Sequence, residues 1–130
     1  MKLARFSVFL TSIVYALIGV IFLFDPVYWA SSLDISLPTP TAIIDFRATY
    51  GGSMLAIAVF LLYCLKNSEF LRIGILFQAI SLAGFGLTRG LGIIFTAGSR
   101  PVNYYLLAAE VFGVGLAVFC LSRFGKTDNI

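Results

Sequence analysis

Four charged residues lie inside apolar stretches or at their edges, and they are the candidates for chemistry in this chain: Asp45, Arg47, Arg89 and Glu110. A charge inside the hydrocarbon of a membrane costs on the order of 3 kcal/mol or more, so it is usually functional and needs a partner. Glu110 has no basic residue within four positions along the chain, so its partner must come from another segment. An arginine fork suits this role because it donates parallel hydrogen bonds to a carboxylate. We therefore expect Arg47, Arg89 and Glu110 to converge as a ligand-binding site.

Three further residues are expected around this group. Tyr50 follows Arg47 by about one helical turn, and Tyr15 lies at a depth similar to that of Glu110, so both tyrosines could donate hydrogen bonds. Two arginines facing one carboxylate leave a positive charge, unless Asp45 balances it from the rim. Such a site suits an anionic head group or a carboxylate. The alternative, an ion pair that only fixes the register of packed helices, stays open.

Other chemistries have little support in the sequence. The chain has no histidine, which removes the commonest general base and the commonest metal ligand. No metal-ligand cluster and no pairing of a nucleophile with a base can be recognised, so we expect no metal, no cofactor and no enzyme activity. The basic residues are scattered rather than gathered in a patch, which argues against a nucleic-acid partner.

The composition indicates the kind of protein that carries these charges. Of the 130 residues, 60% are hydrophobic and only 15 are charged, nine basic and six acidic. The mean hydropathy is +1.00. So few charges cannot cover the surface of a soluble domain of this size. We therefore expect a single integral membrane domain over residues 1–130.

Four apolar stretches are long enough to cross a hydrocarbon core, which takes about 20 helical residues. They predict an all-α bundle of four transmembrane helices, over about residues 6–24, 43–65, 70–95 and 102–121. The first stretch resembles a signal peptide, but Asp25-Pro26 followed by bulky Tyr28 and Trp29 is a poor cleavage site. We therefore interpret it as a retained helix.

The distribution of lysine and arginine predicts the orientation of the bundle. Six basic residues fall on one side of the predicted spans: Lys2, Arg5, Lys66, Arg72, Arg123 and Lys126. The opposite side carries only Arg100 in the third loop. Because basic residues favour the cytoplasmic side, both termini are expected there.

The first outer loop has about twenty residues, and its start favours a short helix. Asp25 can cap a helix and Pro26 suits its first position. Trp29 is typical of the membrane interface. We expect a short interfacial helix ended by the stretch at residues 37–40; a loop with interfacial anchors is the alternative.

Small and polar residues at helical spacing predict contacts between helices. The fourth span has Ala109, Gly113 and Ala117 four residues apart, and the third has Gly86 and Gly90. Such stripes allow backbones to approach closely. They also leave open a homo-oligomer or docking onto a larger membrane complex.

Three segments together resemble a known family. They are residues 45–52, Asp-Phe-Arg-Ala-Thr-Tyr-Gly-Gly, residues 86–92, Gly-Leu-Thr-Arg-Gly-Leu-Gly, and Glu110. In this order they resemble a bacterial four-helix membrane family known as a domain of unknown function, itself loosely similar to DoxX-like membrane proteins. The resemblance implies a multi-pass protein of the bacterial inner membrane and no established activity.

The function expected from these observations is binding, with membrane lipids as the immediate partners. We expect an outward-facing Arg/Glu site that holds an anionic lipid or an amphipathic acid in cell-envelope maintenance. One alternative is a small proton-coupled transporter that uses Glu110. Another is an accessory subunit of a larger membrane complex.

Overall fold

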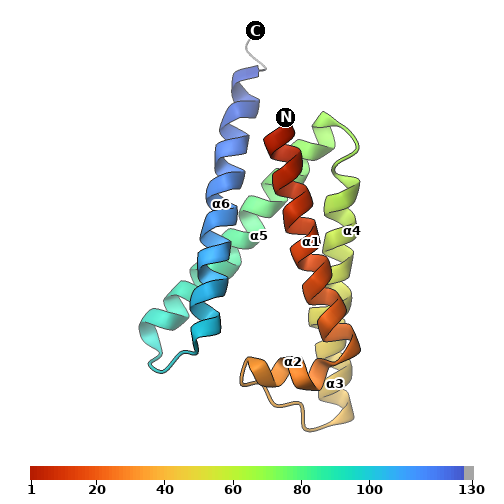
Figure 1. The fold of residues 1–130 in the computed structure, drawn as a ribbon, viewed down its shortest axis with the longest axis vertical. Helices are drawn as coiled ribbons and strands as arrows, with labels where there is room; N and C mark the ends of the chain where they lie inside the picture. The colour runs from red at the N-terminus through yellow and green to blue at the C-terminus, as the bar shows by residue number, and fades with distance from the viewer. Residues whose placement is uncertain (128–130) are drawn as a thin grey trace. The chain divides into compact units, whose positions relative to one another are not determined.

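The computed structural model describes residues 1–127, with side chains up to Phe124, so the side chain of Lys126 and residues 128–130 lie outside it. The described part of the chain is built from helices and the loops between them. Figure 1 shows the elements in chain order: α1 (Lys2–Phe24), α2 (Pro26–Ser32), α3 (Pro40–Phe46), the π-helix η1 (Arg47–Gly52), α4 (Ser53–Tyr63), α5 (Ser68–Phe95) and α6 (Pro101–Thr127).

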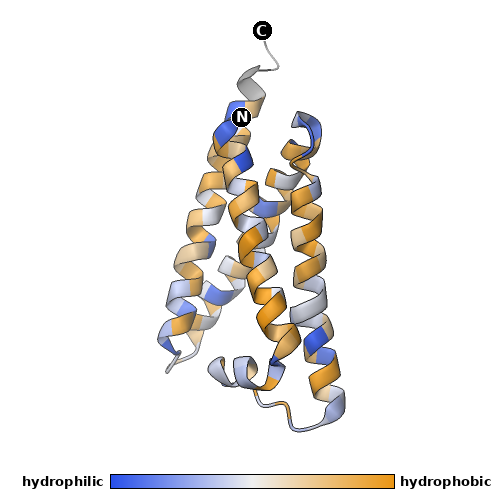
Figure 2. Ribbon diagram, turned by 45° about the vertical axis from the view of Figure 1, so that its right-hand side comes forward, coloured by the Kyte–Doolittle hydropathy of each residue, from blue (hydrophilic) through white to orange (hydrophobic). Residues whose placement is uncertain are grey.

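Four helical stretches are long and apolar enough to cross a membrane, as the sequence predicts. They are Lys2–Phe24, Pro40–Tyr63, Ser68–Phe95 and Pro101–Phe124, and the second of them joins α3, η1 and α4. Figure 2 shows hydrophobic residues along most of their length. The second stretch begins three residues earlier than expected, because Thr39 Oγ1 accepts a hydrogen bond from the Ala42 amide and Pro40 occupies the first turn.

The short helix expected in the first loop is present as α2. Asp25 caps it by accepting a 3.2 Å hydrogen bond from the Tyr28 amide, and Pro26 occupies the first turn. The prediction of its end was wrong, because the helix stops at Ser32 and not at residues 37–40. The chain turns there instead: Asp34 adopts the left-handed conformation at φ 59°, which short polar side chains tolerate.

The described chain divides into two compact units. Residues 9–63 form one, and residues 1–8 together with the chain from residue 64 onward form the other. The division falls within α1, so the first residues of that helix pack with α5 and α6.

In the unit of residues 9–63, an aromatic cluster packs where α1, α2 and the second span meet. The rings of Phe22 and Phe46 lie 5.2 Å apart, and Tyr50 stacks on Phe46 at 4.5 Å. The backbones come close at Gly19 and Gly51, since a Cβ on Gly19 would lie 2.9 Å from the Gly51 carbonyl oxygen.

In the other unit, α5 and α6 pack against each other and cross (Figure 1). Gly86 and Gly90 of α5 face Leu107 of α6, which agrees with the predicted contact stripe on that helix. The stripe predicted on α6 was partly wrong, because Ala109 is exposed. The buried residues of α6 follow a spacing of three and four instead: Glu110, Gly113, Ala117 and Cys120.

A buried polar contact joins α1, α5 and α6 within this unit. Ser7 Oγ lies 2.9 Å from Nε2 and 3.1 Å from Oε1 of Gln78, and Gln78 Nε2 also donates to the carbonyl oxygen of Gly113. Both polar side chains are almost fully buried. Close by, Gly74 leaves room for Cys64, and burial raises the pKa of the Cys64 thiol.

Candidate functional site

The centre of the candidate site is an ion pair between Arg89 on α5 and Glu110 on α6. Arg89 Nε lies 3.1 Å from both carboxylate oxygens of Glu110, and Arg89 Nη2 donates to Oε1 at 3.0 Å. The arginine therefore presents its side edge to the carboxylate, a geometry that offsets desolvation well. Side-chain exposure is 24% for Arg89 and 10% for Glu110, so the carboxylate is the deeper partner. Of the three residues predicted to converge, Arg89 and Glu110 are therefore in contact in the structure.

Two neutral side chains continue the hydrogen bonding from the ion pair to the α5–α6 loop. Arg89 Nη1 donates to Asn103 Oδ1 at 2.8 Å, and Asn103 Nδ2 donates to Ser99 Oγ at 3.0 Å. Sequence reasoning missed Asn103. A signal was available, because Asn103 precedes Glu110 by seven residues and so lies two turns away on the same helix face.

Backbone packing around the pair keeps the carboxylate at this place. A Cβ on Gly86 of α5 would lie 3.5 Å from Glu110 Cβ and 3.8 Å from Glu110 Oε2. These are ordinary van der Waals distances, so Glu110 packs closely against α5 at Gly86, one helical turn before Arg89. Arg89 itself lies six residues before the end of α5, about 9 Å along the helix axis.

An open cavity of about 830 Å³ lies beside Arg89, between α5, the α5–α6 loop and the start of α6. Its polar lining comes from Arg89, Asn103 and four hydroxyl side chains, those of Ser81, Thr88, Thr96 and Ser99. Phe85, Ile93, glycines and Ala97 supply apolar walls, and no side-chain atom lies within 4 Å of a Cβ placed on Gly84 or Gly92. Volumes of this size are usual for binding sites of small organic molecules.

Arg89 has hydrogen-bonding capacity left toward this cavity. A guanidinium group carries five N–H donors. The ion pair and Asn103 engage one on Nε, one on Nη1 and one on Nη2, so about two of the five, one on each Nη, are left over. The arrangement can therefore hold a partly buried anion or another acceptor.

The other predicted site residues belong to the unit of residues 9–63. Asp45 and Arg47 are exposed, Tyr50 is packed on Phe46, and Tyr15 is buried. Their convergence with Arg89 and Glu110 stays a prediction. Sequence reasoning missed the π-helix, which begins at Arg47 and includes Tyr50 and both glycines. Such segments are rare and are frequent at functional sites.

Among the described residues, no group of three or more histidine, cysteine, aspartate or glutamate side chains could hold a metal ion. The polar chemistry of the cavity therefore comes from one cation, one amide and hydroxyl groups. Such groups are suited to binding and orienting a ligand through hydrogen bonds, and the nearby carboxylate of Glu110 is already paired with Arg89.

The fold and site define a class of small helical protein with four potential membrane spans and an ion pair within them. The chain belongs to the family described as Domain of unknown function (DUF4345), whose model matches residues 3–121. This match agrees with the resemblance inferred from residues 45–52, residues 86–92 and Glu110. Comparisons with curated proteins and with solved structures gave no match.

Proposed function

We propose that this protein is a binding module of the bacterial inner membrane, in which Arg89 holds the anionic head group of a lipid or an amphipathic acid. The observation that carries the proposal is the partly exposed guanidinium of Arg89, which keeps unused donors beside an 830 Å³ cavity. A ligand of this kind fits a role in cell-envelope maintenance. No redox role is transferred from the looser similarity to DoxX-like proteins.

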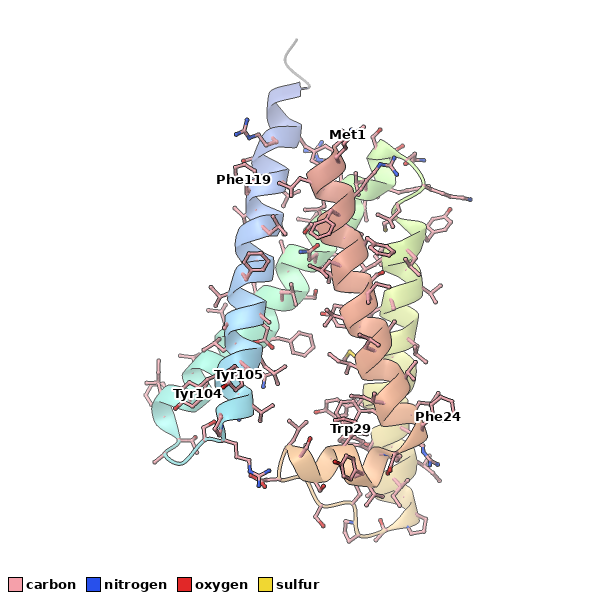
Figure 3. The ribbon with its side chains drawn as sticks, viewed as in Figure 1. Met1, Phe24, Trp29, Tyr104, Tyr105 and Phe119 are labelled. Carbon is pink, nitrogen blue, oxygen red and sulfur yellow. The ribbon has the colours of Figure 1, made fainter. Side chains whose placement is uncertain are left out.

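The proposed orientation follows from the charges at the helix ends. The start of α1, the α4–α5 loop and the end of α6 carry most lysine and arginine residues, and such residues favour the cytoplasmic side of a membrane. The Arg89 cavity then opens toward the outer face. Tyr104 and Tyr105 support a position of the α5–α6 loop near the membrane interface, where tyrosine is common. Both are exposed on the first turns of α6, next to that loop (Figure 3).

The short helix α2 is proposed to lie in the outer interface of the membrane. Tyr28 is 63% exposed, and its ring meets that of Trp29 at 5.2 Å. Figure 3 shows Trp29 on α2, and Figure 1 shows this helix running across the axes of α1 and α3. Amphipathic aromatic rings of this kind favour the level of the lipid head groups.

The cavity offers two kinds of contact to such a ligand. The remaining N–H groups of Arg89 suit a carboxylate or phosphate, because a guanidinium fork matches the geometry of both anions. Phe85 and Ile93 provide apolar surface for an acyl chain. Arg47, Asp45, Tyr50 and Tyr15 belong to the unit of residues 9–63, and their part in binding stays a prediction.

Native mass spectrometry of protein released gently from membranes tests the proposal. Wild type is compared with Arg89→Ala and Arg47→Ala, and Arg72→Ala serves as a matched control that removes the same charge about 26 Å away along α5. We expect a selective adduct in wild type and in the control that is lost from Arg89→Ala. Loss from Arg47→Ala as well would place that residue in the site.

A wild type without a selective adduct, or an adduct kept by Arg89→Ala, would contradict the binding proposal. The arginine would then be structural. In that case an accessory subunit becomes the leading interpretation, and cross-linking to partner proteins is the next experiment.

A further inference from the structure

The net charge of the proposed site has a consequence for how it binds an anion. Arg89 and Glu110 form a neutral pair. An anion that enters this site therefore leaves one uncompensated negative charge among apolar helices, which is unfavourable.

Glu110 is the group best placed to remove that charge. Its side chain is 10% exposed, it borders the same guanidinium that faces the cavity, and it already occupies donors of Arg89. If Glu110 takes up a proton, the site returns to neutrality and Arg89 can turn more of its donors toward the incoming anion. The proton adds to a carboxylate oxygen of Glu110, and no other covalent bond forms or breaks.

One charged group of its own unit acts directly on Glu110: Arg89 favours the ionised carboxylate, and an anion bound at Arg89 offsets that effect. Among the described residues of that unit, Arg89 is the one charged side chain within hydrogen-bond distance of Glu110. Asn103 and Ser99 are neutral. Arg5, from the α1 residues of this unit, bonds the Leu65 carbonyl at the opposite end of α5, and Arg100 in the α5–α6 loop is exposed.

We propose that Glu110 takes up a proton whenever an anionic ligand binds at Arg89, so that the site binds an anion and a proton together. This inference rests on the proposed function, since it assumes that Arg89 binds an anion. It adds a stoichiometry of about one proton per ligand and a dependence of affinity on pH.

Isothermal titration calorimetry of the detergent-solubilised full chain tests this coupling. The probes are dihexanoyl phosphatidylglycerol, which represents a lipid head group, and octanesulfonate, which represents a single-chain acid. Both keep their charge near neutral pH, so they do not contribute protons themselves. Dihexanoyl phosphatidylcholine, which has no net charge, is the control. Titrations in two buffers with different ionisation enthalpies count the protons taken up.

In wild type we expect uptake of about one proton per bound anion, and affinity that weakens about tenfold per pH unit as the pH rises. Glu110→Gln should bind without proton uptake and with little pH dependence. Glu69→Gln, which changes an exposed carboxylate in the first turn of α5, should keep the uptake and so assigns it to Glu110. If only one of the two probes binds, the result shows whether the site takes a lipid head group or a single-chain acid.

Two outcomes overturn the inference in different ways. Arg89-dependent binding to wild type without proton uptake would reject the coupling and keep the binding function. No Arg89-dependent binding of either probe at any pH would reject both. The wild-type measurement decides even if Glu110→Gln does not fold.

Discussion

The side-chain amide of Gln78 on α5 donates a 3.1 Å hydrogen bond to the backbone carbonyl oxygen of Gly113 on α6, and the same amide meets Ser7 of α1. One buried side chain thus joins three helices of a single compact unit. Such contacts fix helix register even where their net energy is small.

Replacing Gln78 by Leu should lower the free energy of unfolding by about 1 kcal/mol, because hydrogen bonds between membrane helices are worth roughly that much. Ser7→Ala should cost less, and the double variant should cost less than the sum of the two, because the side chains share one contact. Unfolding of the purified protein in mixed micelles measures all three. Additive effects would show that Ser7 and Gln78 are not coupled.

The Arg89–Glu110 pair should respond differently to single and double replacement. Glu110→Leu alone leaves Arg89 without its carboxylate and should destabilise the fold by about 3 kcal/mol. Arg89→Met combined with Glu110→Leu should recover most of this loss, because no charge remains unpaired. Thermal unfolding in detergent measures the stability of the single and the double variant relative to wild type. A double variant as unstable as the single one would contradict this account of the pair.

Two glycines should differ sharply in their tolerance of alanine. A Cβ on Gly74 would lie 2.7 Å from Cys64 Cβ, so Gly74→Ala should destabilise by about 1–3 kcal/mol through overpacking. Gly115 on α6 has no side-chain neighbour within 4 Å of the same position. Gly115→Ala is therefore the matched control and should be neutral or slightly stabilising. Equal effects of the two variants on the melting temperature would argue against the Gly74 contact.

Trp29 is the single tryptophan of the chain and reports directly on α2. If α2 lies at the membrane interface, lipids brominated near the head group should quench its fluorescence more strongly than lipids brominated near the chain end. Steady-state quenching in reconstituted vesicles measures this. Stronger quenching by the deep label would place Trp29 within the hydrocarbon.

The sequence predicted the elements of this fold better than their contacts. Charge, proline and capping residues mark the four long helices and α2, because these signals act within a few residues. The partner of Glu110 was predicted to be an arginine of another segment, and the structure pairs it with Arg89. Asn103 and the Ser7–Gln78 contact escaped prediction, because they depend on how helices rotate against each other. Ala109 was assigned to the wrong face for the same reason.

The π-helix η1, between α3 and α4, determines the direction in which Asp45 and the rest of α3 face. A π-helical turn holds more residues than an α-helical turn, so η1 works as a one-residue insertion within a continuous span. Each inserted residue turns the preceding segment by about 100° relative to the following one. Asp45 and the rest of α3 therefore face a side of the membrane span that an unbroken α-helix would not give them. Removing one residue from 47–52 would preserve the length needed to cross a membrane, yet it would rotate that acidic group away from its present direction.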